Sequence, residues 1–502
     1  MTRMNRRGFL TAAAASALTV RAALAQPVEV LGGPPDPQGL ARRPRAKPRP
    51  SSEALIAQAG LGGVVSFAAI DLDSGEVIEA RGGDTPLPPA STLKSITALY
   101  ALDRLGADHR FRTRILRMGD TLVLAGGGDP VLSTDDLDRL AEALVATGAK
   151  SPARFAVWGG ALPRIAELEP DQAVWLAYNP TISGMILNFN RVHLGWRQAA
   201  GDYQLSLEAR AERNSPRAYS ITAAPGPQRE LFTYSADDKR EHWLISRAAM
   251  GRAGSRWLPV RQPELYAGDV FQTLCRARGL VLPAPEVIDQ LPEGVSELAG
   301  IDSPSLREIL LGMMRYSTNL TAEVVGLHAS GATSLAASGQ AMAGWLKERG
   351  GSGDLRFADH SGLSADSQIT AQSMARLMAG YGATAGLREL MKDDPLTEDL
   401  GRDPAALARI EAKTGTLNFV SNLAGYASGT EGRQIAFAVL CGDLDRRAAS
   451  EGKELPAGVS TWTKRAKTLQ RQLIEGWSSG AVEGAVEGLP IAAGAEPEPI
   501  AR

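Results

Sequence analysis

The chain has 502 residues, of which 54 are Lys or Arg and 56 are Asp or Glu, so its formal net charge is −2. A chain of this length exceeds what one hydrophobic core usually supports, so two or more domains are expected. The balanced charge offers no global electrostatic reason to expect nucleic acid as a partner.

Cysteine and histidine are sparse and scattered. The two cysteines, Cys275 and Cys441, show neither a metal-ligand spacing nor the pattern of a disulfide framework, so one disulfide and two buried thiols both remain open. No two of the five histidines stand at helical metal-ligand spacing. We therefore expect neither a metal nor a cofactor.

Residues 1–25 are typical of an export signal. Arg6-Arg7 precede an apolar stretch from 9 to 20, and Ala23-Leu24-Ala25 fits a small-residue cleavage site. The arginine pair favours the twin-arginine route, with an ordinary secretory signal as the alternative. Because the apolar stretch is short for a membrane span, we expect a periplasmic mature protein with no integral membrane span.

Residues 26–52 are rich in Pro and Gly and then basic, a composition that cannot bury enough apolar surface to fold alone. We interpret them as a flexible leader. A solvated linker is the simplest interpretation, although the positive charge would also suit acidic envelope polymers or lipid head groups. Residues 478–502 lack helical or strand periodicity and are predicted to be a disordered tail.

The folded part opens with a predicted β-hairpin, in which apolar runs at 64–72 and 77–80 flank a turn-forming Asp73-Ser74-Gly75-Glu76. A helix follows. It is expected to open near Ser91, because Leu or Ile recurs at every third position from 93 to 105.

From residue 111 to residue 288 the sequence pattern changes to short, strand-like apolar runs that are separated by turn residues. Helical periodicity then returns, and strand-like runs and a closing helix complete the folded part. The expected strands are 114–116, 121–124, 155–158, 203–207, 241–245, 410–417, 423–427 and 435–440, and the expected helices are 306–314, 320–327, 371–381 and 466–477.

These patterns predict an α+β fold in which both ends of the chain supply strands to one domain. Residues 53–108 and 296–477 are assigned to that domain, and residues 109–295 to a β-rich insertion within it.

Three short motifs carry candidate chemistry, and each is weak on its own. Ser91-Thr92-Leu93-Lys94 places a hydroxyl and an amine three residues apart, on one face of the predicted helix. A lysine that burial or a nearby cation keeps neutral can accept the serine proton, and the helix N-terminus offers N–H groups to an oxyanion. Such a pair also arises often by chance.

The second motif, Ser317-Thr318-Asn319, follows the amphipathic segment 306–314. The Ser317 hydroxyl could relay a proton to a leaving amine, and Asn319 could hold both Lys94 and a substrate amide. A helix cap or turn is the alternative.

The third motif, Lys413-Thr414-Gly415-Thr416, lies in a strand-like run. Lys413 and Thr414 can bind a carboxylate, and the Thr416 N–H can be a second oxyanion donor. Gly415 is expected to let an edge strand pass close to a ligand backbone, so that a peptide adds to the strand by β-augmentation. A simple turn is the alternative.

All three motifs occur in this order in a chain with an export signal, and together they resemble the signature of the active-site serine penicillin-recognising enzymes. Over roughly residues 55–477 the chain also resembles the D-alanyl-D-alanine carboxypeptidase/endopeptidase family of penicillin-binding protein 4. The segments that carry this likeness are Gly126-Gly127-Gly128-Asp129-Pro130, Tyr178-Asn179-Pro180, 188–190, 316–323, 361–364 and 423–426.

The resemblance implies a penicillin-binding domain split by a large insertion. It implies a Ser91 acyl-enzyme that acts on peptidoglycan stem peptides, either ending in D-Ala-D-Ala or D,D-crosslinked, and that β-lactams acylate. It further implies that Asp171, Tyr178 and Asn418 contact the substrate.

Three positions depart from the family pattern. Asn418 stands in place of a glutamine, Ala365 in place of a frequent arginine and His360 in place of a frequent glycine. These departures leave the preferred stem peptide open, as well as the balance between carboxypeptidase and endopeptidase activity.

Two other functions remain open. A β-lactamase or esterase on the same scaffold would need rapid deacylation, for which no additional carboxylate motif is evident. A non-catalytic peptidoglycan-binding homologue would have a decayed site, whereas all residues of the three motifs are present.

Overall fold

The computed structural model describes residues 50–479, apart from 354, 405 and 430–431. The predicted export signal, nearly all of the predicted leader and nearly all of the predicted tail lie outside the described residues. At the two ends of the described chain, the Ser51 hydroxyl caps α1 (Ser52–Ala59), and α11 (Val459–Ser478) extends to Ser478.

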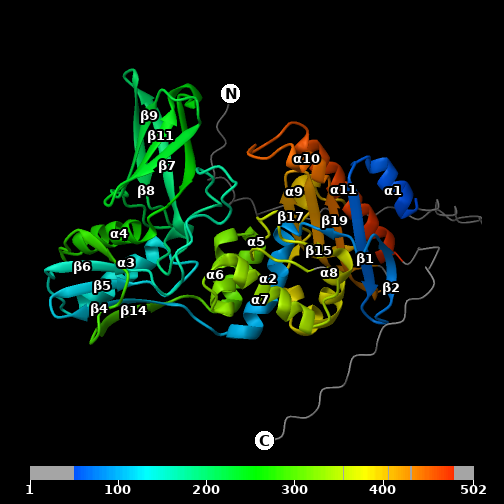
Figure 1. Ribbon diagram of the computed structural model, residues 1–502, viewed down its shortest axis with the longest axis horizontal. Helices are drawn as coiled ribbons and strands as arrows, with labels where there is room; N and C mark the ends of the chain where they lie inside the picture. The colour runs from blue at the N-terminus through cyan, green and yellow to red at the C-terminus, as the bar shows by residue number, and fades with distance from the viewer. Residues whose placement is uncertain (1–49, 354, 405, 430–431, 480–502) are drawn as a thin grey trace, which may run out of the picture. The chain divides into compact units, whose positions relative to one another are not determined.

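A six-stranded antiparallel sheet takes its strands from both ends of the described chain, as expected (Figure 1). Its hairpin, its three-stranded meander and its closing helix all agree with the predicted elements. The strand order is β16 (Lys392–Asp393), β17 (Arg409–Leu417), β18 (Val420–Ser428), β19 (Gln434–Gly442), β1 (Val64–Asp71) and β2 (Val77–Arg81).

Helices cover both faces of this sheet, which explains why its central strands are buried at nearly every position. Along β1, Phe67 and Ala69 pack towards α1 and α11, whereas Ala68 and Ile70 pack towards the other helical layer. That layer consists of α2 (Leu93–Leu105), α5 (Leu306–Tyr316), α6 (Asn319–Ser330), α7 (Leu335–Glu348) and α8 (Ala371–Leu377).

Shorter elements connect these layers. They are the 3-10 turns η1 (Ala90–Thr92) and η5 (Leu387–Leu390), the short helical turn η4 (Met378–Gly382), the strand pair β3 (Pro86–Leu87) and β15 (Ile369–Thr370), and the helices α9 (Thr397–Leu400) and α10 (Leu444–Ala448).

Between α2 and α5 the chain forms three further sheets and two helices. The five-stranded sheet has the order β13 (Pro285–Ile288), β6 (Arg154–Trp158), β5 (Thr121–Ala125), β4 (Arg112–Met118) and β14 (Ser296–Asp302). The three-stranded sheets are β12 (Ala253–Pro259), β7 (Arg191–Ala199) and β8 (Asp202–Glu208), and β10 (Phe232–Ala236), β11 (Glu241–Ser246) and β9 (Ile221–Gly226); the helices are α3 (Thr134–Ala146) and α4 (Pro263–Ala277).

The pairing of β14 differs from the predicted boundary at residue 295. Residues 296–302 pair with β4 rather than with the six-stranded sheet. Beside this pair, the Ser303 N–H donates to the Phe111 carbonyl at 2.8 Å. The chain therefore enters the inserted segment and returns from it at one place. The pairing extends the inserted segment to Asp302, and the other predicted domain boundaries remain predictions.

The description of this segment as β-rich is also incomplete, because α3 and α4 pack on its five-stranded sheet. The spacing of Leu137, Leu140 and Leu144 fits a helix, and Ser133 and Asp136 form a capping box at its start. Both signals are visible in the sequence.

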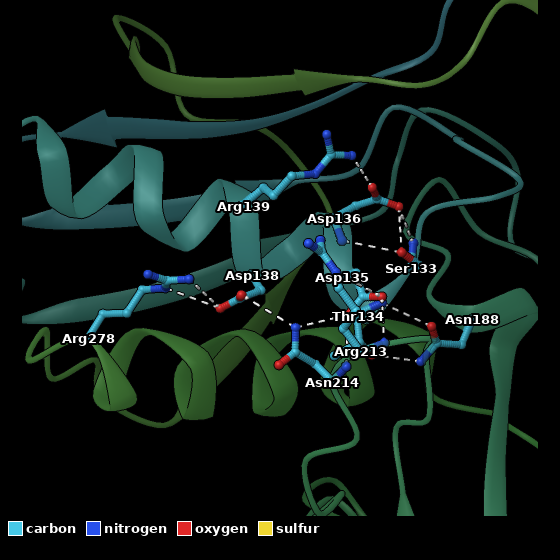
Figure 2. A network of polar contacts seen from close by, with 10 residues as sticks. All are labelled: Ser133, Thr134, Asp135, Asp136, Asp138, Arg139, Asn188, Arg213, Asn214 and Arg278. Carbon is cyan, nitrogen blue, oxygen red and sulfur yellow. Dashed lines mark hydrogen bonds and ion pairs between the residues drawn. The ribbon is translucent and has the colours of Figure 1, made fainter. Parts of the chain in front are cut away.

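Figure 2 shows how the first turns of α3 hold the inserted segment together. The Asp135 carboxylate accepts the N–H groups of Arg213 and Asn214 at 3.0 and 2.9 Å. One turn later, Asp138 accepts from the Arg278 guanidinium at 2.9 Å. The connection between β8 and β9 and the end of α4 are therefore both anchored on α3.

Both cysteines are free and buried. Cys275 lies in the core of the inserted segment and Cys441 in the core beneath α11, so they are two thiols rather than one disulfide. None of the helices in the described residues combines the length and the apolar character needed to cross a membrane.

Candidate active site

Ser91 lies in η1, the turn that leads into α2, so the helix begins where the sequence predicts. The preceding residue, Ala90, has φ of 48°, a left-handed conformation that a residue with a side chain adopts only where its surroundings impose it. Asn422 on β18 contributes to that constraint, because its Nδ2 donates to the carbonyl oxygens of Pro88 and Pro89 at 2.8 and 2.9 Å. The sheet thus fixes the turn that carries the serine.

The Lys94 side chain is completely buried, and its Nζ has three polar partners. It lies 2.9 Å from Ser91 Oγ, 2.9 Å from Asn319 Oδ1 and 2.8 Å from the Ser361 carbonyl oxygen. The structure therefore brings residues of the first two motifs together at one amine. The contact with Ser361 was not predicted.

Burial lowers the pKa of the Lys94 amine to about 8, because an ammonium loses its hydration there. The nearby carboxyl groups of Glu323 and Asp359 oppose this shift, since a negative charge favours the ammonium. With a pKa near 8, part of the lysine is neutral at neutral pH, and the neutral form can take a proton from Ser91.

Ser317 occupies the junction between α5 and α6, with φ of 56°. Ser317 therefore ends a helix, which agrees with the predicted alternative of a helix cap or turn. Its hydroxyl is also part of the site. Ser317 Oγ accepts from Lys413 Nζ at 2.8 Å, and the same amine donates to the Thr414 carbonyl at 2.9 Å. Burial and the charge of Lys94 lower the pKa of Lys413 well below its usual value.

The third motif lies in β17, which pairs with the short β16 only at Glu411 and Ala412. Among the described residues, the second half of this strand has no neighbouring strand on its outer side. Thr414 is half-buried and Thr416 is exposed, so both are accessible to a ligand.

The structure shows a reason for Gly415 that lies within the protein itself. A Cβ there would lie 2.8 Å from the Pro89 carbonyl oxygen and 3.0 Å from the Ser91 nitrogen. The close approach of β17 to η1 therefore requires a glycine here, and the close passage of a ligand backbone stays a prediction. This contact sets the distance between the third motif and the serine.

Two buried carboxyl groups beside Lys94 were not among the predicted site residues. Glu323 lies one helical turn after Asn319 on α6, and its two carboxylate oxygens accept the N–H groups of His360 and Ser361, both at 2.9 Å. Burial and the neighbouring Asp359 raise the pKa of Glu323, whereas the hydrogen bonds from Ser361 and His360 and the charge of Lys94 oppose this shift and favour the carboxylate. The segment 316–323 was noted for its resemblance, but nothing in the local sequence shows that its last residue is buried.

Asp359 lies in the loop between α7 and β15 and is held by later residues of that loop. It accepts the Ser364 N–H at 3.0 Å and the Ser367 hydroxyl at 2.6 Å, and burial raises its pKa. No group of three or more His, Cys, Asp or Glu side chains in the described part of the chain is arranged to hold a metal ion.

His360 contributes to the site through its backbone. Its ring is fully buried, stacks against Tyr100 with ring centroids 6.4 Å apart, and has Nε2 2.6 Å from the Ser338 hydroxyl. Burial lowers the pKa of this imidazole to about 3, so the ring is neutral. The substitution of the frequent glycine thus affects packing in the core.

Two of the residues assigned to substrate contact by resemblance, Asp171 and Asn418, line one pocket of about 370 Å³. Ala365 lines it too, so the frequent arginine is absent from this wall. Arg447, from α10, lines the same pocket; burial lowers the pKa of its guanidinium, and the carboxylates of Glu169 and Glu451 oppose this shift. The pocket therefore has an arginine from a different element.

Tyr178 and Asn418, two of the positions named by the resemblance, each make a hydrogen bond that connects distant segments. The Tyr178 ring is exposed, and its backbone carbonyl accepts from Asn319 Nδ2 at 3.5 Å. Asn418 donates from Nδ2 to the Lys453 carbonyl at 2.8 Å, which ties the β17–β18 turn to the loop after α10.

Fold and site together define a serine enzyme with the penicillin-recognising fold. The family model of the D-Ala-D-Ala carboxypeptidase 3 (S13) family matches residues 51–465. The chain belongs to that family and is a serine peptidase, which confirms the recognition made from the motifs.

Relatives and solved structures agree with this assignment. The chain is 28% identical over 465 residues to the D-alanyl-D-alanine carboxypeptidase of Actinomadura sp., covering 82% of this chain and 84% of that protein. It is similar in fold to penicillin binding protein 4 (dacB) from Haemophilus influenzae, with TM-score 0.68, 20% identity and coverage of 84% of this chain and 99% of that one. The same protein complexed with a novel β-lactam gives TM-score 0.64, at 20% identity and 85% and 99% coverage.

Proposed function

We propose that the protein is a periplasmic D-Ala-D-Ala carboxypeptidase that also cleaves D,D-crosslinked stem peptides, through an acyl-enzyme on Ser91. One observation carries the proposal: three motifs far apart in sequence meet around one hydroxyl. Lys94 links Ser91 to Asn319, and Lys413 links Ser317 to the open edge of β17.

In the first step, Ser91 Oγ attacks the carbonyl carbon of the penultimate D-Ala, and its proton passes to the neutral amine of Lys94. The backbone N–H groups of Ser91 and Thr416 hold the oxyanion that forms. Lys413 and Thr414 bind the terminal carboxylate, which favours the charged form of the lysine.

In the second step, the bond between the carbonyl carbon and the nitrogen of the terminal D-Ala breaks. The Ser317 hydroxyl gives its proton to the departing amine and regains one from the adjacent Lys413. Water then attacks the Ser91 ester and its released proton restores Lys413, while the proton held by Lys94 returns to Ser91 Oγ as the ester bond breaks. The shortened peptide leaves and the enzyme is back in its starting state. A β-lactam follows the first step and remains attached, because its leaving nitrogen stays in the same molecule.

The site favours a peptidase over a β-lactamase. Rapid hydrolysis of the ester would need a general base free to activate water, and a carboxylate is one group that can do so. Both oxygens of Glu323 are occupied by backbone N–H groups, and Asp359 is held by Ser364 and Ser367. These two buried groups are thus engaged in holding the loop.

The experiment uses the mature chain and a synthetic pentapeptide that ends in D-Ala-D-Ala. Release of free D-Ala by the wild-type protein, and its loss in Ser91→Ala, are expected. A peptide ending in L-Ala-L-Ala is the control, and a D,D-crosslinked dimer measures the endopeptidase share. No release by the wild type, or equal release by Ser91→Ala, would contradict the proposal.

A further inference from the structure

The partners of Lys94 constrain where its lone pair points. A neutral amine has two hydrogens and one lone pair to share among three neighbours. The Ser361 carbonyl and Asn319 Oδ1 can only accept, whereas the Ser91 hydroxyl can donate. The two hydrogens of the neutral amine therefore go to Ser361 and Asn319, and the lone pair faces the serine proton.

The orientation of the amine thus depends on the Ser361 carbonyl as much as on Asn319. Ser361 lies in the loop between α7 and β15, which needs a separate restraint. Glu323 supplies it, because its two oxygens accept two successive backbone N–H groups, those of His360 and Ser361, both at 2.9 Å. The loop also packs directly on the serine turn: a Cβ on Gly362 would lie 1.8 Å from the Ala90 carbonyl oxygen.

We infer that Glu323 is a positioning residue, which holds the Ser361 carbonyl in place and so directs the lone pair of Lys94 at Ser91. Glu323 touches neither the substrate nor the serine hydroxyl in this scheme. The inference rests on the proposed function, because it assumes that Lys94 is the base for Ser91.

The charge of Glu323 has a second, separable effect. The charged groups that face Lys94 are Glu323 on α6, Asp359 in the loop and Lys413 on β17. The two carboxylates favour the ammonium, so removing one of them lowers the pKa of Lys94. Loss of Glu323 should therefore slow the reaction and also move its ascending pH limb towards lower pH.

The test is the rate of acylation by a fluorescent penicillin, measured against concentration and pH in wild type and Glu323→Gln. The amide keeps the size of the side chain but presents an NH₂ donor to one of the two backbone N–H groups. We expect the limiting rate to fall on the order of a hundredfold, as for a small misplacement of a reacting group. The half-saturating concentration should stay the same, and the ascending limb should move to lower pH.

Ser338→Ala is the matched control. It removes another buried hydrogen bond of the same loop, to the His360 ring, without changing the partners of Lys94. Its limiting rate and pH limb should equal those of the wild type. If Glu323→Gln does not fold, Glu323→Asp is measured instead. Its carboxylate, shorter by one methylene, cannot span both N–H groups, so a reduced limiting rate is again expected.

A wild-type limiting rate and pH limb in the folded Glu323 variant would overturn the inference alone. Failure of the wild-type protein to be acylated, or acylation that persists in Ser91→Ala, would instead overturn the proposed function and the inference with it. A rate that falls in Ser338→Ala as much as in Glu323→Gln would show a general effect of the loop, and would also overturn the inference.

Discussion

At the reacting hydroxyl, the decisive quantity is the protonation state of Lys94. Its burial removes the hydration that normally stabilises an ammonium, whereas the negative charges of two nearby carboxylates stabilise the ammonium in part. The balance leaves a pKa of about 8, close to the pH at which a general base is both present and strong enough.

The first prediction concerns this titration. In the proposed mechanism neutral Lys94 is the active form, so the rate of acylation by penicillin should rise with pH through about 8 and level off above it. Lys94→Met removes the base and should lower the rate by about 10²- to 10⁴-fold. Stopped-flow fluorescence from pH 6 to 10 measures both, and a rate that does not change with pH in this range would contradict the assignment.

Single residues also show how far the sequence could predict the site. Ser91 and Lys94 could be named because helical spacing is a local property of the sequence. Asn319 could be named because its motif occurs in order with the other two. The left-handed backbone of Ala90 and the restraint exerted by Glu323 could not, because both depend on segments far away in the chain, which meet only in the folded protein.

At the scale of elements, the contact of β17 with η1 matters most. The strand approaches the turn so closely that only glycine fits at position 415. The approach places the open edge of the strand, where the substrate would add, beside the serine.

The second prediction is therefore that Gly415→Ala separates these two elements. Its Cβ must displace the Pro89 carbonyl or the Ser91 backbone, so acylation should slow on the order of a hundredfold while the fold is kept. Gly344→Ala on α7, where a Cβ meets nothing, is the control and should leave the rate unchanged. Circular dichroism verifies folding, and a wild-type rate in Gly415→Ala would show that the contact is not needed.

The third prediction concerns the anchor on α3. Asp135→Asn replaces an acceptor oxygen by a donor that faces backbone N–H groups, which should cost about 1–3 kcal/mol of unfolding free energy. Acylation of the folded variant should be unaffected, because the network contains no neighbour of Lys94. Urea denaturation and the penicillin assay measure the two quantities.

The pH dependence gives this prediction its sign. Burial opposes the charge of Asp135, but hydrogen bonds from Arg213 and Asn214 outweigh it and lower its pKa below the usual value. The stabilisation is therefore complete above the ordinary carboxyl range and is lost as pH falls through the lowered pKa. The difference between wild type and Asp135→Asn should shrink towards acid pH, and a constant difference would contradict this account.

Elements also mark a limit of the sequence analysis. The longer strands of the six-stranded sheet and most of the helices that cover it were predicted, because their apolar periodicity is strong and turn-forming residues separate them. In the inserted segment α3 and α4 were missed, although the capping box of α3 was visible, because short strand-like runs dominate the pattern there.

At the scale of the whole molecule, the pocket beside the site is assembled from segments that are distant in the sequence. Asp171 belongs to the inserted segment, Ala365 to the loop before β15, Asn418 to the β17–β18 turn and Arg447 to α10. The sequence showed that an arginine was missing at position 365, but not that another element supplies one.

The fourth prediction follows from that replacement. If the side chain of a stem peptide with a free carboxylate enters this pocket, Arg447→Ala should raise KM for it about tenfold or more, with kcat and penicillin acylation unchanged. Arg446→Ala, which removes the neighbouring exposed arginine that pairs with Asp443, is the control. An unchanged KM in Arg447→Ala would exclude this pocket from recognition of the carboxylate.

The most direct measurement for the central claim is the intact mass of the mature protein after incubation with penicillin. One adduct per chain, carried by the proteolytic peptide that contains Ser91 and absent in Ser91→Ala, is the predicted result. An unmodified mass, or an adduct that persists in Ser91→Ala, would contradict the claim that the hydroxyl beside Lys94 is the nucleophile.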